Sequence, residues 1–321
     1  MKYIISILTI VNIILFILAI YFSFIKKKKL TDKFTQYQIK ILNDAYHDKN
    51  VINNLGNTPI YAINMEKSTD RRQNLKKQFD NYDIKNYKII KAIDGLKITT
   101  LNGKQRKPSS YTTFNKSKLT SYKAGDIYFK IREPDYASNS EVGCTLSHLK
   151  AIETAYNDNN DKVIIVEDDI NLFPIKTWSK TLDEFLKTAP NDWEAIYDGF
   201  NKDKHYNKNL EFIKCSISQP FGAWFYIINR KGMKAVLNKF KKNNYFILDA
   251  YKNNLKRRGL SGITADIYIP WLIQAYSCKT NLAMTLNDQN KLNSNIHTYD
   301  TQEHINFSRN IIDRLYKKFK R

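Results

Sequence analysis

A run of three acidic residues gives the chain its strongest chemical signal. Glu167, Asp168 and Asp169 directly follow residues 163–166, Val-Ile-Ile-Val, which have the composition of a buried strand. Three carboxylates at the end of one strand would repel one another unless a cation lay among them. Hard divalent cations such as Mn²⁺ or Mg²⁺ use carboxylate oxygens together with substrate phosphates. The pattern therefore predicts a metal site, although a solvated acidic turn that caps the next helix would read the same way.

A second cluster, Ser68-Thr69-Asp70-Arg71-Arg72, follows the first apolar run of the main body. Ser68 or Thr69 can cap a helix there, and Asp70 suits its first turn. The two arginines could then reach the phosphates of a nucleotide or lie on a solvated helix face.

A third cluster spans residues 141–148, Glu-Val-Gly-Cys-Thr-Leu-Ser-His. We interpret it as a glycine turn that leads into a helix carrying Ser147 and His148. A lone histidine in such a place is more often hydrogen-bonded to the backbone than catalytic. Cys144 is either a reactive thiol or a small buried filler.

These clusters, in this order, resemble glycosyltransferase family 25, the family of lipooligosaccharide (lipopolysaccharide) biosynthesis glycosyltransferases and collagen galactosyltransferases. The matching segments are IYAINMEKSTDRR at 60–72, KAIDG at 91–95, EVGCTLSHLKAI at 141–152, VIIVEDDINLF at 163–173 and FGAWFYIINRKGMKAVL at 221–237. The resemblance implies a GT-A-like nucleotide-sugar-binding fold, a UDP-sugar as donor substrate and Mn²⁺ (or Mg²⁺) as the cation. It also implies a hexose, galactose or glucose, and a glycan or protein hydroxyl as acceptor.

Carried over by position, the resemblance makes Glu167, Asp168 and Asp169 the metal motif, with Asp169 as the expected direct ligand. Segment 64–72 would lie beside the nucleotide and segment 222–224 near the sugar or acceptor. The expected donor-binding residues are Asn64, Ser68, Asp70, Arg71, Arg72, Ser147, His148, Gly222 and Trp224.

Glycosyl transfer would place two demands on these residues. A metal ion and basic side chains would neutralise the departing diphosphate. Members of the family mostly form β-linkages, which implies inversion, and an inverting enzyme needs a carboxylate to take the proton of the acceptor hydroxyl. Asp266 and Asp249 are the candidates. We prefer Asp266, which precedes an apolar and aromatic run ending at Trp271, although a plain helix N-cap is the alternative.

The elements that position these residues read as an α/β fold with a mainly parallel sheet, in which ligands bind beyond the carboxyl ends of strands. The expected strands are 60–64, 87–92, 163–166, 195–197 and 223–228, and the expected helices are 69–82, 145–157, 178–188 and 231–240. We expect a transmembrane anchor with a basic flank at 1–29, a stalk or capping helix at 30–57, a glycosyltransferase domain at 58–300 with an insertion or lid at 96–135, and a basic helix at 301–321.

Residues 3–25 are almost wholly apolar. A bilayer core of ~30 Å needs about 20 such residues in a helix, and no convincing signal-peptide cleavage site follows, so we expect a single-pass membrane protein. Lys26 to Lys29 follow this stretch and only Lys2 precedes it, which favours a cytoplasmic catalytic domain. Glycosylation sequons at Asn115 and Asn306 would be usable only in a lumen. The sequence leaves the sidedness open.

The charge balance does not decide the function. Lys and Arg number 52 against 31 Asp and Glu, a net charge of +21, but the lysines are spread along the chain. A main role in binding nucleic acid is therefore not expected. Two alternatives to a glycosyltransferase remain: a metal-dependent nuclease or phosphohydrolase, and a non-catalytic membrane-tethered binding protein of the same fold. The nuclease would need further metal-binding carboxylates with a positioned base.

Overall fold

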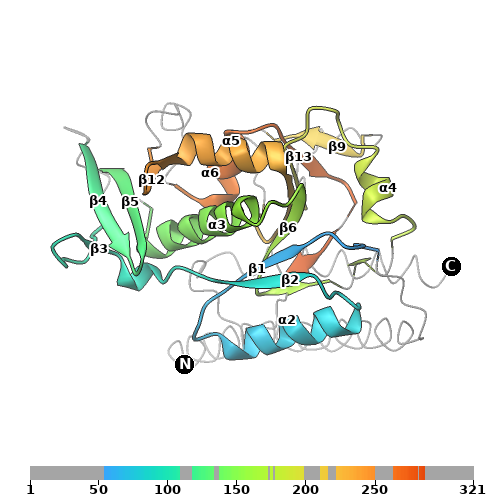
Figure 1. Cartoon of the computed structure of the whole chain (residues 1–321), viewed down its shortest axis with the longest axis horizontal. Coiled ribbons are helices and arrows are strands. Elements are labelled where there is room, and N and C mark those ends of the chain that lie inside the picture. The colour runs from blue at the N-terminus through green and yellow to red at the C-terminus, as the bar shows by residue number, and fades with distance from the viewer. Residues whose placement is uncertain are drawn as a thin grey trace, which may run out of the picture. The chain divides into compact units, whose positions relative to one another are not determined.

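A seven-stranded mixed sheet forms the centre of the part of the chain that the structure, a computed structural model, describes (Figure 1). The described residues are 54–108, 118–133, 137–172, 174–175, 178–198, 210–215, 222–249, 263–280 and 282–285. In spatial order the strands are β2 (Tyr87–Lys91), β1 (Ile60–Asn64), β6 (Lys162–Glu167), β10 (Phe225–Asn229), β8 (Ala195–Tyr197), β13 (Ala275–Cys278) and β9 (Phe212–Lys214).

The directions of these strands correct the prediction of a mainly parallel sheet. Strand β1 pairs in parallel with β2 and β6, and β8 pairs in parallel with β13. Strand β10 runs antiparallel between β6 and β8, and β9 runs antiparallel to β13. The apolar run of β10 could not reveal this reversal, because a central strand that is buried on both faces has the same composition in either direction.

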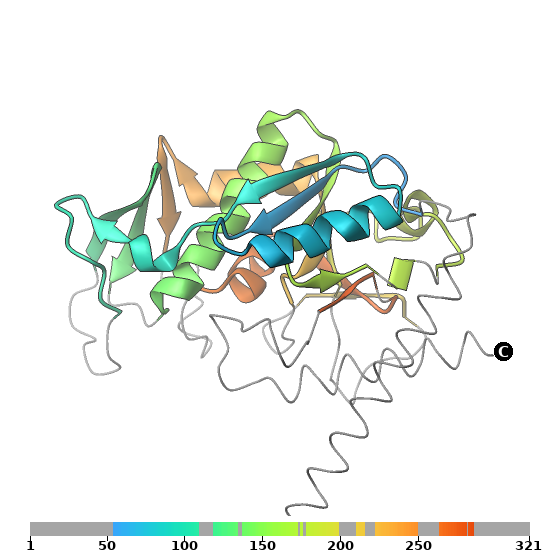
Figure 2. The same ribbon diagram turned by 90° about the horizontal axis from the view of Figure 1, so that it is seen from below.

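Helices cover both faces of the sheet (Figures 1 and 2). Helices α3 (Asn139–Asn157) and α5 (Arg230–Phe240) lie on one face, and α2 (Thr69–Asn81) lies on the other. The strands alternate between the two cores, as the two-residue period of a strand requires. Buried on the α2 face are Ile60, Ala62, Ile164 and Val166 with Leu75 and Phe79; buried on the α3 face are Tyr61, Ile63, Val163 and Ile165 with Leu146 and Leu149.

A second sheet of five strands lies beside the first, next to the amino-terminal end of α3 (Figure 1). Its order is β11 (Lys241–Lys242), β12 (Tyr245–Leu248), β5 (Ile127–Glu133), β4 (Lys118–Ala124) and β3 (Thr99–Thr100). Strands β4 and β5 form an antiparallel hairpin within the stretch 96–135. Smaller elements are η1 (Gly95–Lys97), α4 (Leu182–Leu186), α6 (Ala265–Trp271) and the strand pair β7 (Ile170–Asn171) and β14 (Met284–Thr285).

Helix α3 begins six residues before the predicted start, because a capping box lies upstream. Ser138 Oγ accepts a hydrogen bond from Glu141 N, and the Glu141 carboxylate accepts one from Ser138 N at 2.6 Å. Gly143, which we interpreted as part of a turn, therefore lies inside the helix. Its missing side chain lets the helix backbone approach residues 93–95.

The prediction of a single-pass membrane protein is contradicted. Among the helices that the structure describes, none is long and apolar enough to cross a membrane. The apolar stretch 3–25, the expected stalk at 30–57 up to residue 53 and the expected helix at 301–321 lie outside the described residues.

Candidate active site

The carboxyl ends of β1 and β6 lie side by side, because the two strands are parallel and Ile63 is the register partner of Glu167. Asn64 ends β1 and Glu167 ends β6. Asp168 and Asp169 form the turn that follows β6. The predicted nucleotide segment and the predicted metal motif therefore meet at one edge of the sheet.

Asp168 faces the α2 side of the sheet, in step with Ile164 and Val166, and both of its carboxylate oxygens are engaged. Asn64 Nδ2 donates to Asp168 Oδ2 at 2.6 Å, and Arg71 Nη1 donates to Asp168 Oδ1 at 3.0 Å. Burial raises the pKa of Asp168, and the Arg71 and Asn64 contacts oppose that rise. These contacts fix Asp168 in place.

Two further residues of the α2 cluster, residues 68–72, form hydrogen bonds with Asn64. Arg72 Nε donates to Asn64 Oδ1 at 2.9 Å, and Asn64 Nδ2 also contacts the Ser68 carbonyl oxygen at 3.1 Å. Ser68 occupies the N-cap position of α2 but makes no cap hydrogen bond through its side chain. Asp70 is exposed in the first turn of the helix. The cluster thus holds Asn64 and Asp168 together.

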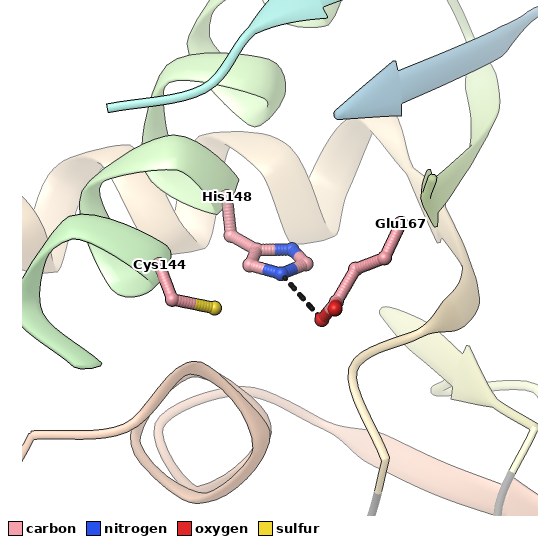
Figure 3. A group of neighbouring side chains, drawn as sticks. All are labelled: Cys144, His148 and Glu167. Carbon is pink, nitrogen blue, oxygen red and sulfur yellow. Dashed lines mark hydrogen bonds and ion pairs between the residues drawn. The ribbon is translucent and has the colours of Figure 1, made fainter. Parts of the chain in front are cut away.

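Glu167 faces the opposite side, toward α3. Its Oε1 lies 3.3 Å from Nε2 of the fully buried His148, whose Nδ1 lies 3.2 Å from the Tyr226 hydroxyl (Figure 3). Cys144, one helical turn before His148, points to the same place. Burial raises the pKa of the Cys144 thiol well above its usual value, and the negative charge of Glu167 adds to this rise. Tyr226 and Cys144 were not among the expected site residues.

Asp169 lies between these two groups and has the most perturbed carboxylate of the motif. Its Oδ2 is 3.6 Å from Arg71 Nη1, but its buried Oδ1 has no hydrogen-bond partner in the described part of the chain. Burial raises the pKa of Asp169 to about 7, Glu167 adds to the rise and Arg71 opposes it. The three acids therefore do not form one cluster: the strand period sends Glu167 and Asp168 to opposite faces.

Ser147 acts within the scaffold. Its hydroxyl accepts a hydrogen bond from Ile93 N at 2.8 Å and donates one to the Gly143 carbonyl oxygen at 2.7 Å. These bonds fasten α3 to the Lys-Ala-Ile-Asp-Gly segment at 91–95. The segment thereby sets the position of His148, the next residue on the helix.

A further carboxylate, Asp198, was missed by the sequence reasoning. Its oxygens accept hydrogen bonds from Leu282 N at 3.0 Å and Ala283 N at 2.9 Å, and from the Trp224 indole nitrogen at 3.3 Å. Burial raises the pKa of Asp198 to about 6. The signal was present, because Asp198 directly follows the apolar strand 195–197, just as the acidic motif follows residues 163–166.

Residues 222–224 enter this edge from the other direction, because β10 is antiparallel to β6. The carbonyl oxygen of Trp224 accepts a hydrogen bond from Glu167 N at 2.9 Å. Gly222 packs under the Trp224 ring, where a Cβ atom would lie 1.4 Å from a ring carbon. The predicted sugar segment and the acidic motif are thus in direct contact.

The two candidate bases occupy different surroundings. Asp266 lies in the first turn of α6, and its charge acts on the Cys144 thiol and on the Tyr197 hydroxyl. Asp249 is buried at the end of β12, where its Oδ1 accepts a hydrogen bond from Arg132 Nε at 2.8 Å. The charge of Asp266 therefore acts on the Cys144 and Glu167 group, whereas Asp249 pairs with Arg132.

Comparison with known proteins gives one family. The model of glycosyltransferase family 25 (LPS biosynthesis protein) matches residues 57–251. Procollagen galactosyltransferase 2 of Mus musculus is 28% identical over 150 residues, which cover 45% of this chain and 21% of that protein. Its Homo sapiens counterpart is 25% identical over 199 residues, 59% of this chain and 29% of that protein.

A glycosyltransferase 25 family member of Anopheles gambiae is 24% identical over 206 residues, which cover 60% of this chain and 30% of that protein. The chain thus spans less than a third of the length of these curated relatives. The matched region 57–251 includes the acidic motif, the α2 cluster, and the Cys144 and His148 pair.

Proposed function

The chain belongs to glycosyltransferase family 25, and on this premise we propose that it transfers a hexose, galactose or glucose, from a UDP-sugar to a hydroxyl of a glycan or protein acceptor. Relatives named procollagen galactosyltransferase support a hexose as the transferred sugar. The observation that carries the proposal is Asp169, a half-buried residue at the carboxyl edge of the sheet, whose buried Oδ1 has no hydrogen-bond partner among the described residues. A partly desolvated carboxylate with one buried, unpartnered oxygen is a typical ligand for a cation.

The donor set fits Mn²⁺ or Mg²⁺. A cation that takes the place of a proton relieves a carboxylate whose pKa is raised to about 7. Glu167 and Asp169 are the proposed ligands. Asp168 is a positioning residue in this proposal, since Asn64 and Arg71 already occupy its two oxygens. When bound, the metal ion would neutralise the charge that develops on the departing diphosphate.

Arg71 supplies fixed positive charge at the same edge. It contacts both Asp168 and Asp169, so it lies where phosphate oxygens would approach the acidic motif. Arg72 is a positioning residue, because its guanidinium binds Asn64 and the Glu66 carbonyl oxygen. Gly222 and Trp224 are proposed to contact the sugar, since Trp224 is bonded to the backbone of Glu167.

Asp266 is the proposed general base. It accepts the proton of the acceptor hydroxyl while that oxygen bonds to the anomeric carbon, and UDP leaves with the electron pair of the broken bond. Attack from the face opposite UDP inverts the anomeric centre. The charge of Asp266 on Cys144, beside Glu167, supports this role.

The test is UDP release by the purified protein with Mn²⁺ and a panel of UDP-sugars that includes UDP-galactose and UDP-glucose. We expect turnover of one donor that is lost with EDTA and in Asp169→Ala, and kept in Asp126→Ala, a control at an exposed turn. A folded protein that neither turns over nor binds any donor would contradict the proposal and favour a binding protein. Salt-sensitive cleavage of DNA or RNA would favour the nuclease.

A further inference from the structure

The group formed by Cys144, His148 and Glu167 has the composition of a site for a softer metal ion than Mn²⁺. Cys144 Sγ, a His148 ring nitrogen and a Glu167 carboxylate oxygen all lie within 4.8 Å of one another (Figure 3). A thiol, an imidazole and a carboxylate are the ligand types of zinc sites, whereas Mn²⁺ and Mg²⁺ favour oxygen alone. The proposed transfer reaction uses neither Cys144 nor His148.

The backbone holds these ligands in a fixed arrangement. Cys144 and His148 are four residues apart on α3, so both project from one face of the helix. That face points to the end of β6, where Glu167 lies (Figure 3). Helix α3 is itself fixed by the close contact of Gly143 with residues 93–95 and by the hydrogen bonds of Ser147. Two rigid elements therefore supply the three ligands.

His148 has a hydrogen-bonding partner on the ring nitrogen that faces away from Glu167, and an outer partner of this kind orients a metal-binding histidine. Its Nδ1 lies 3.2 Å from the Tyr226 hydroxyl, which leaves Nε2 directed at Glu167. When the ring proton is on Nδ1, the Tyr226 oxygen accepts it, and the lone pair of Nε2 is available to a metal ion. The His148 ring is fully buried, so water does not compete for its nitrogens.

The surrounding charge is negative. The carboxylates of Glu167, Asp266, Asp169 and Glu141 all act on the Cys144 thiol. A cation bound beside these carboxylates would offset their mutual repulsion. Cys144 is also only partly buried, so the group is not sealed from solvent.

We propose that Cys144, His148 and Glu167 bind Zn²⁺ through the thiolate sulfur, Nε2 and a carboxylate oxygen. Zn–N or Zn–O bonds of roughly 2.0 Å and a Zn–S bond of roughly 2.3 Å place tetrahedral ligands about 3.3–3.5 Å apart. The His148 and Glu167 atoms already lie 3.3 Å apart, and all three ligand atoms lie within 4.8 Å of one another, so side-chain adjustments alone can bring them to that spacing. Binding releases the thiol proton to solvent, and His148 binds as the tautomer that carries its ring proton on Nδ1.

Zn²⁺ at this position takes Glu167 away from the cation of the transfer reaction. This consequence rests on the proposed function, in which Glu167 is a ligand of that cation. Zn²⁺ is therefore expected to inhibit transfer at concentrations at which Mn²⁺ supports it, and the inhibition is expected to require the Cys144 thiol.

The binding itself is tested without any assay of activity. Co²⁺ replaces Zn²⁺ in such sites, and a bound thiolate gives it a near-ultraviolet charge-transfer band. We expect that band in the wild-type full chain, its displacement by Zn²⁺, and its loss in Cys144→Ser. Cys215→Ser is the matched control, because Cys215 is a partly exposed cysteine outside the group, and it should keep the band.

Zn²⁺ affinity is expected to fall at least about 10-fold in Cys144→Ser and in His148→Gln, with circular dichroism verifying that both variants are folded. Equal Zn²⁺ affinity in wild type and Cys144→Ser, or no thiolate band, would overturn the proposal. Zn²⁺ binding without any UDP release would instead refute the proposed function and leave this site standing.

Discussion

Gly143 of α3 lies against the backbone of Gly95: a methyl group at position 143 would stand 2.9 Å from Gly95 N. The Ile93 carbonyl oxygen would be equally close, at 2.8 Å. This contact joins two segments, 91–95 and 141–152, that the sequence alone presents as separate motifs. It fixes how α3 sits on the sheet and hence where Cys144 and His148 project.

Gly143→Ala is expected to destabilise the protein by about 1–3 kcal/mol, because the new methyl group meets backbone that cannot turn aside. In an unobstructed helix the same change would stabilise by roughly 0.5–1 kcal/mol. Urea unfolding of both proteins measures the difference. A variant as stable as the wild type would contradict the close contact.

Asn64→Asp is expected to destabilise the protein by at least about 2 kcal/mol at pH 8, since it removes a donor and sets a second carboxylate against Asp168. The loss should shrink toward pH 4.5, where one of the two carboxylates is protonated. Asn64→Ala is the matched variant and should lose stability to a similar extent at both pH values. Identical pH profiles for the two variants would argue against the contact of residue 64 with Asp168.

Asp169→Asn is expected to stabilise the metal-free protein, increasingly so as the pH rises. The pKa of Asp169 is raised to about 7 in the fold, against about 3.9 in an unfolded chain. The group therefore favours the folded state below pH ~4 and loses that contribution as the pH rises through 7. Asparagine imitates the protonated form, so the Tm of Asp169→Asn should exceed that of the wild type by an amount that grows between pH 4.5 and 8.

The measurement for Asp169 is thermal unfolding in EDTA, with Asp126→Asn at an exposed turn as the control. Added Mn²⁺ should raise the Tm of the wild type and leave that of Asp169→Asn unchanged. A gap in Tm that is constant with pH would show that the Asp169 carboxylate is not held in a desolvated state.

Asp198→Ala is expected to release the segment at 282–283, because Leu282 N and Ala283 N lose the oxygens that accept their hydrogen bonds. Hydrogen exchange should accelerate at these two amides and remain unchanged in β1 and β6. Trp224 loses the partner of its indole nitrogen as well, so its contact with a bound sugar should weaken. Unchanged exchange at both amides would contradict this role of Asp198.

Asp266→Asn is expected to slow transfer by about 10²–10⁴-fold with little change in UDP affinity, because the amide cannot take the acceptor proton. Asp249→Asn is the comparison: Asp249 pairs with Arg132, so its loss should lower stability more than it lowers the rate constant of transfer. If Asp249→Asn were slow and Asp266→Asn fully active, Asp249 would be the general base in place of Asp266.

Most of the central sheet could be predicted from the sequence, because its strands are short aliphatic runs with clear ends. The strands at 60–64 and 195–197 have the predicted bounds, and α2 and α5 differ from prediction by one residue at one end. The reversed direction of β10 could not be predicted, since direction depends on partners that are distant in sequence. The start of α3 depends on Ser138 and Glu141, a capping box outside the segment that we interpreted as helix.

The candidate site was predictable in its residue types and less so in its geometry. Glu167, Asp168 and Asp169 are adjacent in sequence, but a strand sends alternate side chains to opposite faces, and this divides them between α3 and α2. The roles of Asn64 and Ser147 could not be predicted either, because their partners are distant in sequence. Their hydrogen bonds reach Asp168 and Ile93, 104 and 54 residues away, and such distances leave no local pattern.

During synthesis, β1 cannot pair with β6 until the ribosome has made the residues between them. Strand β2 follows β1 within 30 residues, but β6 begins about 100 residues after β1 ends. At 5–20 residues per second a ribosome needs roughly 5–20 s to deliver that partner. During this interval one edge of a mostly apolar strand has no native neighbour, which is the condition under which chains aggregate or recruit chaperones. Chains truncated before residue 167 should therefore be insoluble, and slower synthesis at low temperature should lengthen the exposure rather than shorten it.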